Sequence, residues 1–365
     1  MTRYRSNLSE IAELADQLEE DIRARGLEPG ERYLTTQDAC RMLRKGTTVT
    51  NRALQLLEKR NVIVRQHRRG AYVAESQQSE APLRRVHLLV HQHYLETEGT
   101  ANDGVLFGIQ GELPGTSVSI NYLPSDDETA YVDRLIADSL DSNEPDGFVL
   151  IRSSLETQRH LAACGLPTVY YGTVYASVEK LPSVSRDMFE IGRLAGEYLI
   201  SRGRTRLVYF SRCRTMAGDH QTFDGIRQAL IDNGRSLEDL EFRFLPSDKA
   251  DAAAAAMQLM ASRPEETGFL CRNVPLAEGA ASVVQSVVGP DAIHDSVVVC
   301  DYYLKAGETA KYVYPRPTLS PEEQGRVMGR MLAAQARGEA VDPIAEVAPV
   351  EIRRPGEGAR VEGRV

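Results

Sequence analysis

Short apolar runs alternate with helix-forming stretches through most of the chain, and this alternation constrains the fold more than any other feature. The runs lie at residues 86–90, 116–123, 147–151, 167–172, 206–210, 241–246, 268–271 and 296–300. The stretches between them, such as MFEIGRLAGEYLISRG, have the apolar spacing of helices. Strands that alternate with helices of this length form parallel sheets in α/β units. The number of elements predicts two α/β lobes rather than one sheet.

The first 75 residues have a different pattern, of three helices followed by a hairpin. We predict helices at residues 8–25, 36–43 and 47–60, and strands at 61–66 and 70–75. Thr36 is the expected N-cap of the second helix, and Thr47 or Thr48 that of the third. Met42 is expected to face inward. This order of elements predicts a small winged helix-turn-helix domain.

Basic residues gather in this small domain, although the whole chain has a net charge of -9. Residues 41–70 hold Glu58 as their single acid beside Arg41, Arg44, Lys45, Arg52, Lys59, Arg60, Arg65, Arg68 and Arg69. A compact basic patch on an acidic protein is suited to a polyanion. The alternative is a solvated helix face, and charge density alone does not separate the two.

If the domain binds DNA, its residues divide by role. Asn51 and Arg52 begin the third helix, where their forked donors could pair with adenine and guanine. Phosphate contacts are expected from Thr36, Lys45, Thr47, Thr48 and Arg65. His67, Arg68 and Arg69 form the hairpin tip and are suited to a minor groove, and Gly70 lets the wing strand turn. The alternative for the tip is an exposed, solvated hairpin.

Composition and spacing bound the rest of the chain. We expect a winged domain at 1–75, a linker at 76–84, a two-lobed domain at 85–353 and a flexible tail at 354–365. The five cysteines are scattered and form no C-x-x-C pair, so neither disulfides nor zinc are expected. No apolar run reaches the ~18 residues of a membrane span. We therefore expect a soluble, cytoplasmic protein with no cofactor.

Open parallel sheets bind ligands at the carboxyl ends of their strands. This rule nominates His91, His93, Arg152, Ser153, Tyr171, Arg212, Arg214, Arg272, Asn273, Asp301 and Tyr302. If most of these converge, the site is rich in arginine and suits an acidic ligand. His91 and His93 could alternatively begin a metal site, but no further ligands cluster at metal spacing nearby.

Two families resemble the chain. Residues 8–75 are similar to the GntR-type winged helix through L-x-P-G at 27–30, NRALQLL at 51–57 and GAYV at 70–73, although Lys45-Gly46 replaces the usual V-S pair. Residues 86–353 resemble the effector domain of LacI/GalR-type repressors, which has the type I periplasmic-binding fold. The matching segments are PSVSRD at 182–187, IGRLAGEYLISRGRTRLVYF at 191–210, FDGIRQAL at 223–230, VVVCD at 297–301 and PTLS with MGRML at 317–332.

Three positions depart from the sugar-binding members of the LacI/GalR family. Thr222 stands where they usually carry an arginine, Asn273 is followed by Val274 rather than aspartate, and Asp301 is followed by tyrosine rather than a second aspartate. The resemblance therefore implies an effector other than a simple sugar, or a domain that has lost ligand binding.

The resemblance implies a ligand-responsive regulator of transcription, expected to act as a repressor. It would bind a palindromic operator as a homodimer, with a sugar or sugar derivative in the cleft between the lobes. The alternative is a small-molecule binding module whose N-terminal domain binds protein. An enzyme is not expected, because the sequence lacks G-x-S-x-G, H-E-x-x-H and P-loop motifs.

Overall fold

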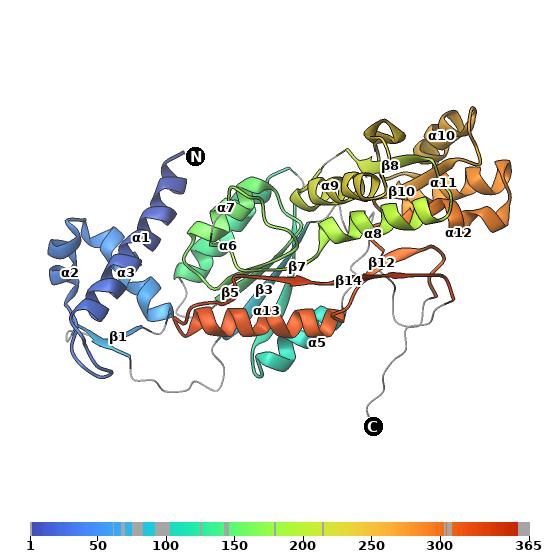
Figure 1. Cartoon of the computed structure of the whole chain (residues 1–365). Helices are drawn as coiled ribbons and strands as arrows, with labels where there is room; N and C mark the ends of the chain where they lie inside the picture. Colours follow the sequence, from blue (N-terminus) through green and yellow to red (C-terminus); the bar gives the residue numbers. More distant parts are fainter. Residues whose placement is uncertain are drawn as a thin grey trace, which may run out of the picture. The chain divides into compact units, whose positions relative to one another are not determined.

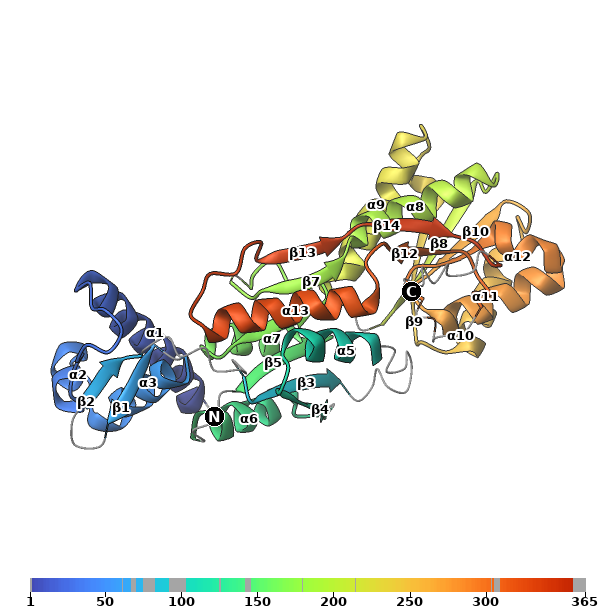
Figure 2. The same ribbon diagram turned by 90° about the horizontal axis from the view of Figure 1, so that it is seen from below.

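A computed structural model describes residues 2–60, 62–66, 70–74, 83–91, 103–124, 126–141, 146–178, 180–213, 215–302, 304 and 309–356. The chain divides into two compact units (Figures 1 and 2). The first unit holds the N-terminal domain and one α/β lobe, from residues 1–92, 102–184 and 321–346. The second holds the other lobe, mainly residues 185–320.

The N-terminal domain has the predicted order of elements. Helices α1 (Thr2–Ala24), α2 (Thr36–Leu43) and α3 (Thr47–Lys59) precede an antiparallel hairpin of β1 (Ile63–Gln66) and β2 (Gly70–Val73). Ala53, Leu54, Leu56 and Leu57 turn one face of α3 into the core. The first helix begins at Thr2, six residues earlier than predicted.

The predicted helix caps were wrong by one residue. Thr35, not Thr36, caps α2: its hydroxyl accepts from the Asp38 backbone N–H at 3.2 Å, and the Asp38 carboxylate accepts from the Thr35 N–H. Gly46 caps α3 without a side-chain hydrogen bond, so Thr47 and Thr48 lie inside the helix. Met42, expected inside, is 36% exposed.

Gly70 occupies the position where the wing strand meets the loop before α2. Its φ of +103° is one that residues with a Cβ rarely adopt. A Cβ there would also lie 3.2 Å from the Leu34 carbonyl oxygen, which accepts a hydrogen bond from the Ala71 N–H. Both facts favour glycine at this position.

The lobe of the first unit is built on a six-stranded sheet with the order β13-β7-β6-β5-β3-β4. Its strands are β3 (Arg85–His91), β4 (Ser117–Leu123), β5 (Asp146–Ile151), β6 (Thr168–Tyr171), β7 (Ser183–Arg186) and β13 (Ala345–Ala348). Strands β4, β3, β5, β6 and β7 are parallel. Its helices are α5 (Asp103–Glu112), α6 (Glu128–Asp141), α7 (Leu155–Ala163) and α13 (Pro321–Ala336).

The lobe of the second unit repeats this design with a four-stranded parallel sheet in the order β11-β10-β8-β9. Its strands are β8 (Arg206–Arg212), β9 (Leu240–Leu245), β10 (Thr267–Cys271) and β11 (Val297–Val299), with a separate antiparallel pair β12 (Tyr314–Pro317) and β14 (Val350–Arg353). Its helices are α8 (Met188–Ser201), α9 (Ala217–Asp232), η1 (Leu237–Asp239), α10 (Lys249–Met260), α11 (Val274–Val287), η2 (Pro290–Ala292) and α12 (Ile293–Ser296).

Both predicted sheets are confirmed, and every apolar run named above overlaps a strand. Periodicity missed α13 and the strands β7, β12, β13 and β14. These strands are each four residues long, and segments such as SVSR and YPRP lack the continuous apolar run of a buried strand.

Glycines allow helices within each lobe to pack with their backbones in contact. Figure 1 shows α8 and α9 side by side. A Cβ on Gly225 of α9 would lie 1.9 Å from the Phe189 carbonyl oxygen, and one on Gly192 of α8 would lie 2.0 Å from the Thr222 carbonyl oxygen. Helices α5 and α13 meet in the same way through Gly108 and Gly325. The α8–α9 contact fixes where α9 begins.

Gly225→Ala is expected to destabilise the second unit by about 2–3 kcal/mol or more, because overpacking a tight contact forces the backbones apart. Gly111→Ala in α5 is the matched control, since its Cβ meets nothing within 4 Å. That change should be neutral or stabilise by up to about 1 kcal/mol. Urea unfolding of the two variants measures the difference, and equal midpoints would contradict the proposed contact.

Candidate functional site

Charged side chains converge at the carboxyl edge of the sheet in the second unit. Arg212 ends β8, Arg272 directly follows β10, and Asp301 follows β11. Strand β8 lies between β9 and β10, so the chain order reverses there. Ligands of open α/β sheets bind at such a reversal, outside the carboxyl ends of the strands. Three of the predicted site residues therefore meet where the topology favours a ligand.

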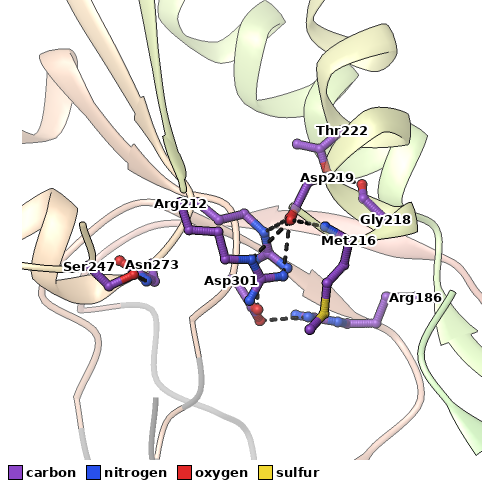
Figure 3. A network of polar contacts seen from close by, with 10 residues as sticks. Arg186, Arg212, Met216, Gly218, Asp219, Thr222, Ser247, Asn273 and Asp301 are labelled. Carbon is purple, nitrogen blue, oxygen red and sulfur yellow. Dashed lines mark hydrogen bonds and ion pairs between the residues drawn. The ribbon is translucent and has the colours of Figure 1, made fainter. Parts of the chain in front are cut away.

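Asp219, in the first turn of α9, is the centre of this cluster (Figure 3). Its carboxylate accepts from Arg212 Nε at 3.0 Å and Nη2 at 3.2 Å, and it pairs with Arg272 Nε. The Met216 backbone N–H donates to the same carboxylate at 2.8 Å. One carboxylate thus joins two strand ends to the start of a helix.

Asp301 extends the cluster to a fifth charged residue. Its carboxylate lies 2.6 Å from Arg272 Nη1 and 2.6 Å from Arg186 Nη2. Arg212, Asp219, Arg272 and Asp301 are each at most 6% exposed. We call these four residues, together with Arg186, the buried charge cluster.

The buried charge cluster carries three positive charges and two negative ones. Burial alone would raise the pKa of Asp219, but the charges of Arg272 and Arg212 and their hydrogen bonds outweigh it and hold that pKa at about 2. The predicted arginine-rich site is corrected in one respect: its arginines converge, but carboxylates already bind them.

Asp219 and Arg186 were not predicted. Asp219 is a polar residue in the first turn of a helix, a position that usually indicates only a favourable charge at the helix N-terminus. Arg186 lies in a strand that periodicity missed. Their signal was therefore three-dimensional, since Asp219 and Arg272 are 53 positions apart in the chain.

Asn273 and Thr222 lie near the cluster, but backbone or neighbouring groups already engage them (Figure 3). Asn273 caps α11: its Oδ1 accepts from the Leu276 N–H, and its Nδ2 donates to Ser247 Oγ at 2.8 Å. The Thr222 hydroxyl donates to the Gly218 carbonyl at 3.0 Å, inside the α8–α9 contact. Thr222 thus supports helix packing.

Tyr302 follows Asp301 in an aromatic group. Its ring meets the Tyr314 ring edge-on at a centroid distance of 5.1 Å, and lies 6.1 Å from the Tyr312 ring. The Tyr302 hydroxyl accepts from the Lys311 N–H at 3.2 Å. The Tyr302 ring thus packs against two buried aromatic rings of the same core.

The candidates of the first unit lie at the carboxyl ends of β5 and β6. Arg152 has a left-handed φ of +52°, and Ser153 is 1% exposed with a hydroxyl that has no hydrogen bond to any described residue. The Tyr171 hydroxyl donates to Gln324 Oε1 of α13 at 2.9 Å. His91 ends β3, while His93 and Arg214 lie outside the described residues.

Of the predicted DNA-contacting residues, four lie in the first two turns of α3 and two in the hairpin strands: Thr47, Thr48, Asn51 and Arg52, then Arg65 and Gly70. Thr47 and Thr48 are exposed, and Asn51 and Arg52 are half-buried. Arg65 of β1 donates to Asn51 Oδ1 at 2.8 Å, so the hairpin holds the amide of α3. Bidentate pairing of Asn51 with adenine would use its Nδ2 and the second lone pair of this Oδ1.

The other predicted DNA contacts are Lys45, Thr36 and the three residues of the hairpin tip. Lys45 is exposed and pairs with Glu10 of α1. Thr36 is half-buried in the first turn of α2. His67, Arg68 and Arg69 lie outside the described residues. Among the described side chains there is no group of three or more potential metal ligands, and no described helix is long and apolar enough to cross a membrane.

Comparison with known proteins identifies the effector domain. The family model described as "Periplasmic binding proteins and sugar binding domain of LacI family" matches residues 108–342, more than half of the chain. The chain belongs to this family. The HTH-type transcriptional regulator GntR of Pseudomonas aeruginosa is 32% identical over 145 residues, 38% of this chain and 40% of that protein's length. The match therefore spans less than half of that relative.

Solved structures show the same fold. The transcriptional regulator CelR in complex with cellobiose is 21% identical with a TM-score of 0.57, over 86% of this chain and 90% of that one. A LacI-family regulatory protein from Chloroflexus aggregans is 19% identical with a TM-score of 0.59, and the match covers 75% of this chain and 98% of that one. The lac repressor dimer bound to operator is 16% identical with a TM-score of 0.58, and the match covers 77% of this chain and 94% of that one. The two parallel-sheet lobes are thus those of the type I periplasmic-binding fold.

Asp219→Asn is expected to destabilise the second unit by about 3–5 kcal/mol, because it removes the buried carboxylate charge that two guanidinium groups share. The folded-state pKa of about 2 lies below the ~3.9 of an unfolded Asp. The wild-type contribution is therefore complete above pH ~4 and is lost as the pH falls toward 2. Urea unfolding at pH 7 and at pH 3 measures both effects.

Asp224→Asn on the same helix is the control. Asp224 pairs with Arg227 at 3.5 Å on the surface, and both side chains are more than 40% exposed. This variant should lose less than about 1 kcal/mol. Equal losses in the two variants would show that the buried charge cluster is not held by Asp219.

Proposed function

We propose that this protein is a ligand-responsive, DNA-binding regulator of transcription with a GntR-type winged helix-turn-helix. The observation that carries the proposal is the exposed start of α3, joined by Arg65 to a wing strand, in a chain that belongs to the LacI family. Relatives of this fold include regulators described as bound to operator and to cellobiose. The basic segment 41–70 supplies the positive charge that a polyanion requires.

The functional form is expected to be a homodimer that binds a palindromic operator and acts as a repressor. Two copies related by a twofold axis present two reading helices to half-sites spaced by helical turns. An apolar edge suits such a contact: Ile120 and Tyr122 of the edge strand β4 are 44% and 49% exposed, and Phe107 of α5 is 64% exposed. These side chains are candidates for the dimer interface.

The effector is a small molecule with an acidic group, and a sugar acid or sugar phosphate is our first choice. The arginines of the buried charge cluster, at the carboxyl edge of the sheet, would receive the acidic group. Tyr302, which follows Asp301 in the chain, would present an aromatic surface to a ring. A ligand that prefers one arrangement of the protein shifts the balance between its states, and so changes DNA binding.

Arg52→Ala should cost about 1–3 kcal/mol of binding to the preferred duplex, selected from genomic fragments by the wild type, and relax the sequence preference at one base. Arg41→Ala removes the same charge from α2, where Arg41 is exposed and pairs with Asp38 at 2.6 Å. That control should lower the affinity for all duplexes by a similar, small amount. Fluorescence anisotropy over a range of salt concentrations measures both, because phosphate contacts make affinity fall steeply with salt.

The competing hypothesis is an N-terminal domain that binds protein. It predicts no binding to any genomic fragment at low salt, and that result would exclude the regulator. Specific binding that survives in the presence of competitor DNA would exclude the alternative.

Thermal-shift screening of neutral sugars, sugar acids and sugar phosphates should identify the effector class. A ligand at a hundred times its Kd adds about 2.7 kcal/mol of apparent stability. We expect acidic ligands to stabilise more than their neutral counterparts. Arg186→Gln should remove that preference, whereas Arg227→Gln on the surface of α9 should retain it. Equal stabilisation by neutral and acidic sugars in the wild type would contradict an acidic effector.

A further inference from the structure

The N-terminal domain and the lobe of the first unit share a tight contact at Gly165. Arg60, directly after α3, donates from Nε to the Gly165 carbonyl oxygen at 3.0 Å, and its Nη1 lies 2.6 Å from Asp16 of α1. The Arg60 side chain is only 14% exposed. A guanidinium that is buried between two elements and hydrogen-bonded to a third fixes their relative placement.

The packing around Gly165 leaves no room for adjustment. Gly165 has a φ of +74°, and a Cβ there would lie 2.7 Å from Arg60 Nη2, 2.9 Å from Leu56 Cδ2 and 3.2 Å from Ala12 Cβ. Ala12, Leu56, Leu161 and Leu166 belong to one continuous apolar core. We call the meeting of Ala12, Leu56 and Arg60 with Gly165 the domain contact.

A second point of attachment lies one residue earlier, at Lys59. Its ammonium nitrogen is buried without a hydrogen bond to any described residue. Burial lowers the pKa of Lys59 to about 8, against the opposing charges of Asp146 and Asp141 in the lobe. Asp146 begins β5 and accepts from the Ser139 hydroxyl at 2.8 Å. Helix α3 also contacts α6, which ends at Asp141, so this end of the lobe lies against α3.

The strands that begin at these two points end at the candidate effector residues. Strand β5 runs from Asp146 to Ile151, directly before Arg152 and Ser153, and six residues span about 20 Å. Strand β6 begins three residues after Gly165 and ends at Tyr171. Both strands are buried and paired in register. Either one moves as a rigid element rather than as a flexible chain.

Helix α13 ties both ends of β6. Near its C-terminus, Gln335 accepts from the Thr168 N–H at 3.1 Å and donates to the Thr168 carbonyl at 3.1 Å. Near its N-terminus, Gln324 accepts from the Tyr171 hydroxyl at 2.9 Å. The two glutamines are separated by about 16 Å along the helix. A displacement at Tyr171 is therefore carried to the turn that holds Gly165.

We propose that the domain contact positions the reading helix α3 on the lobe and is the route by which effector occupancy at Arg152, Ser153 and Tyr171 reaches the DNA. The proposal rests on the proposed function for its DNA readout. Arg60 acts in it as a positioning residue, through α3, and touches neither ligand nor DNA. In a homodimer, two such contacts set the separation of the two reading helices.

Hydrogen exchange of the full-length protein tests the contact without DNA or effector. Arg60→Ala and Gly165→Ala should each speed amide exchange in α1 and in residues 161–168 by about tenfold or more, the expected effect of losing a buried, charge-assisted hydrogen bond. Arg60→Lys keeps the charge, and its amide exchange rates should lie between those of the wild type and of Arg60→Ala. Arg41→Ala is the control with unchanged exchange. Unchanged exchange in both Arg60→Ala and Gly165→Ala overturns the proposal.

Duplexes with two half-sites at varied spacing test the positioning role. The half-sites are taken from a fragment that the wild type selects. The wild type should prefer one spacing by about tenfold, and Arg60→Lys should lose most of that preference while affinity for a single half-site stays within about twofold. An unchanged spacing preference, despite faster exchange in α1, overturns the positioning role.

The two measurements separate this inference from the proposed function. A wild type that binds no duplex defeats the proposed function and the positioning role together. The exchange result then still reports whether the domain contact exists. Loss of affinity for the single half-site in Arg60→Lys would place Arg60 at the DNA and so contradict its role as a residue that acts through α3.

Discussion

A buried carboxylate between guanidinium groups holds the second unit together at its candidate site. Burying one charge without a partner is costly, so Asp219 requires Arg212 and Arg272, and each of these requires Asp219 in return. Because the three residues come from β8, β10 and α9, this requirement fixes two strand ends against one helix. The close α8–α9 contact then sets the position of α9 from the other side. These side chains are therefore held in place by one another, which would lower the entropic cost of binding a ligand there.

The two units solve the same topological problem with different chemistry. In both, the first strand lies inside the sheet and the second lies at its edge, so each has a reversal at the carboxyl ends of its strands. In the second unit, ion pairs lie at this reversal of strand order. The first unit places there Ser153, a buried hydroxyl without a hydrogen bond to a described residue, beside Arg152 in a left-handed conformation. Strained backbone beside a buried polar group is typical of a position kept for a ligand rather than for stability.

The sequence allowed the elements to be predicted better than their relationships. The apolar runs at 206–210 and 268–271 both form strands, because a strand that is buried on both faces is apolar along its whole length. The strand order was not predictable, since the same runs fit other orders. Arg212, Arg272 and Asp301 could be found from the rule for strand ends. Asp219 could not, because only the folded chain brings residues 53 positions apart into contact. Thr35 and Thr36 are equally good caps by composition, and the backbone conformation decided between them.

The basic segment that first indicated a polyanion serves two purposes in the folded chain. Arg60 and Lys59 turn toward the lobe, where one binds Gly165 and the other lies near Asp146. Arg65 holds Asn51 within the domain. Counting cations in residues 41–70 therefore overstates the DNA-facing charge, and the number of phosphates neutralised must be smaller than the number of basic residues. The same inward-facing cations join α3 to the lobe, so part of the basic charge of this segment connects the N-terminal domain to the lobe.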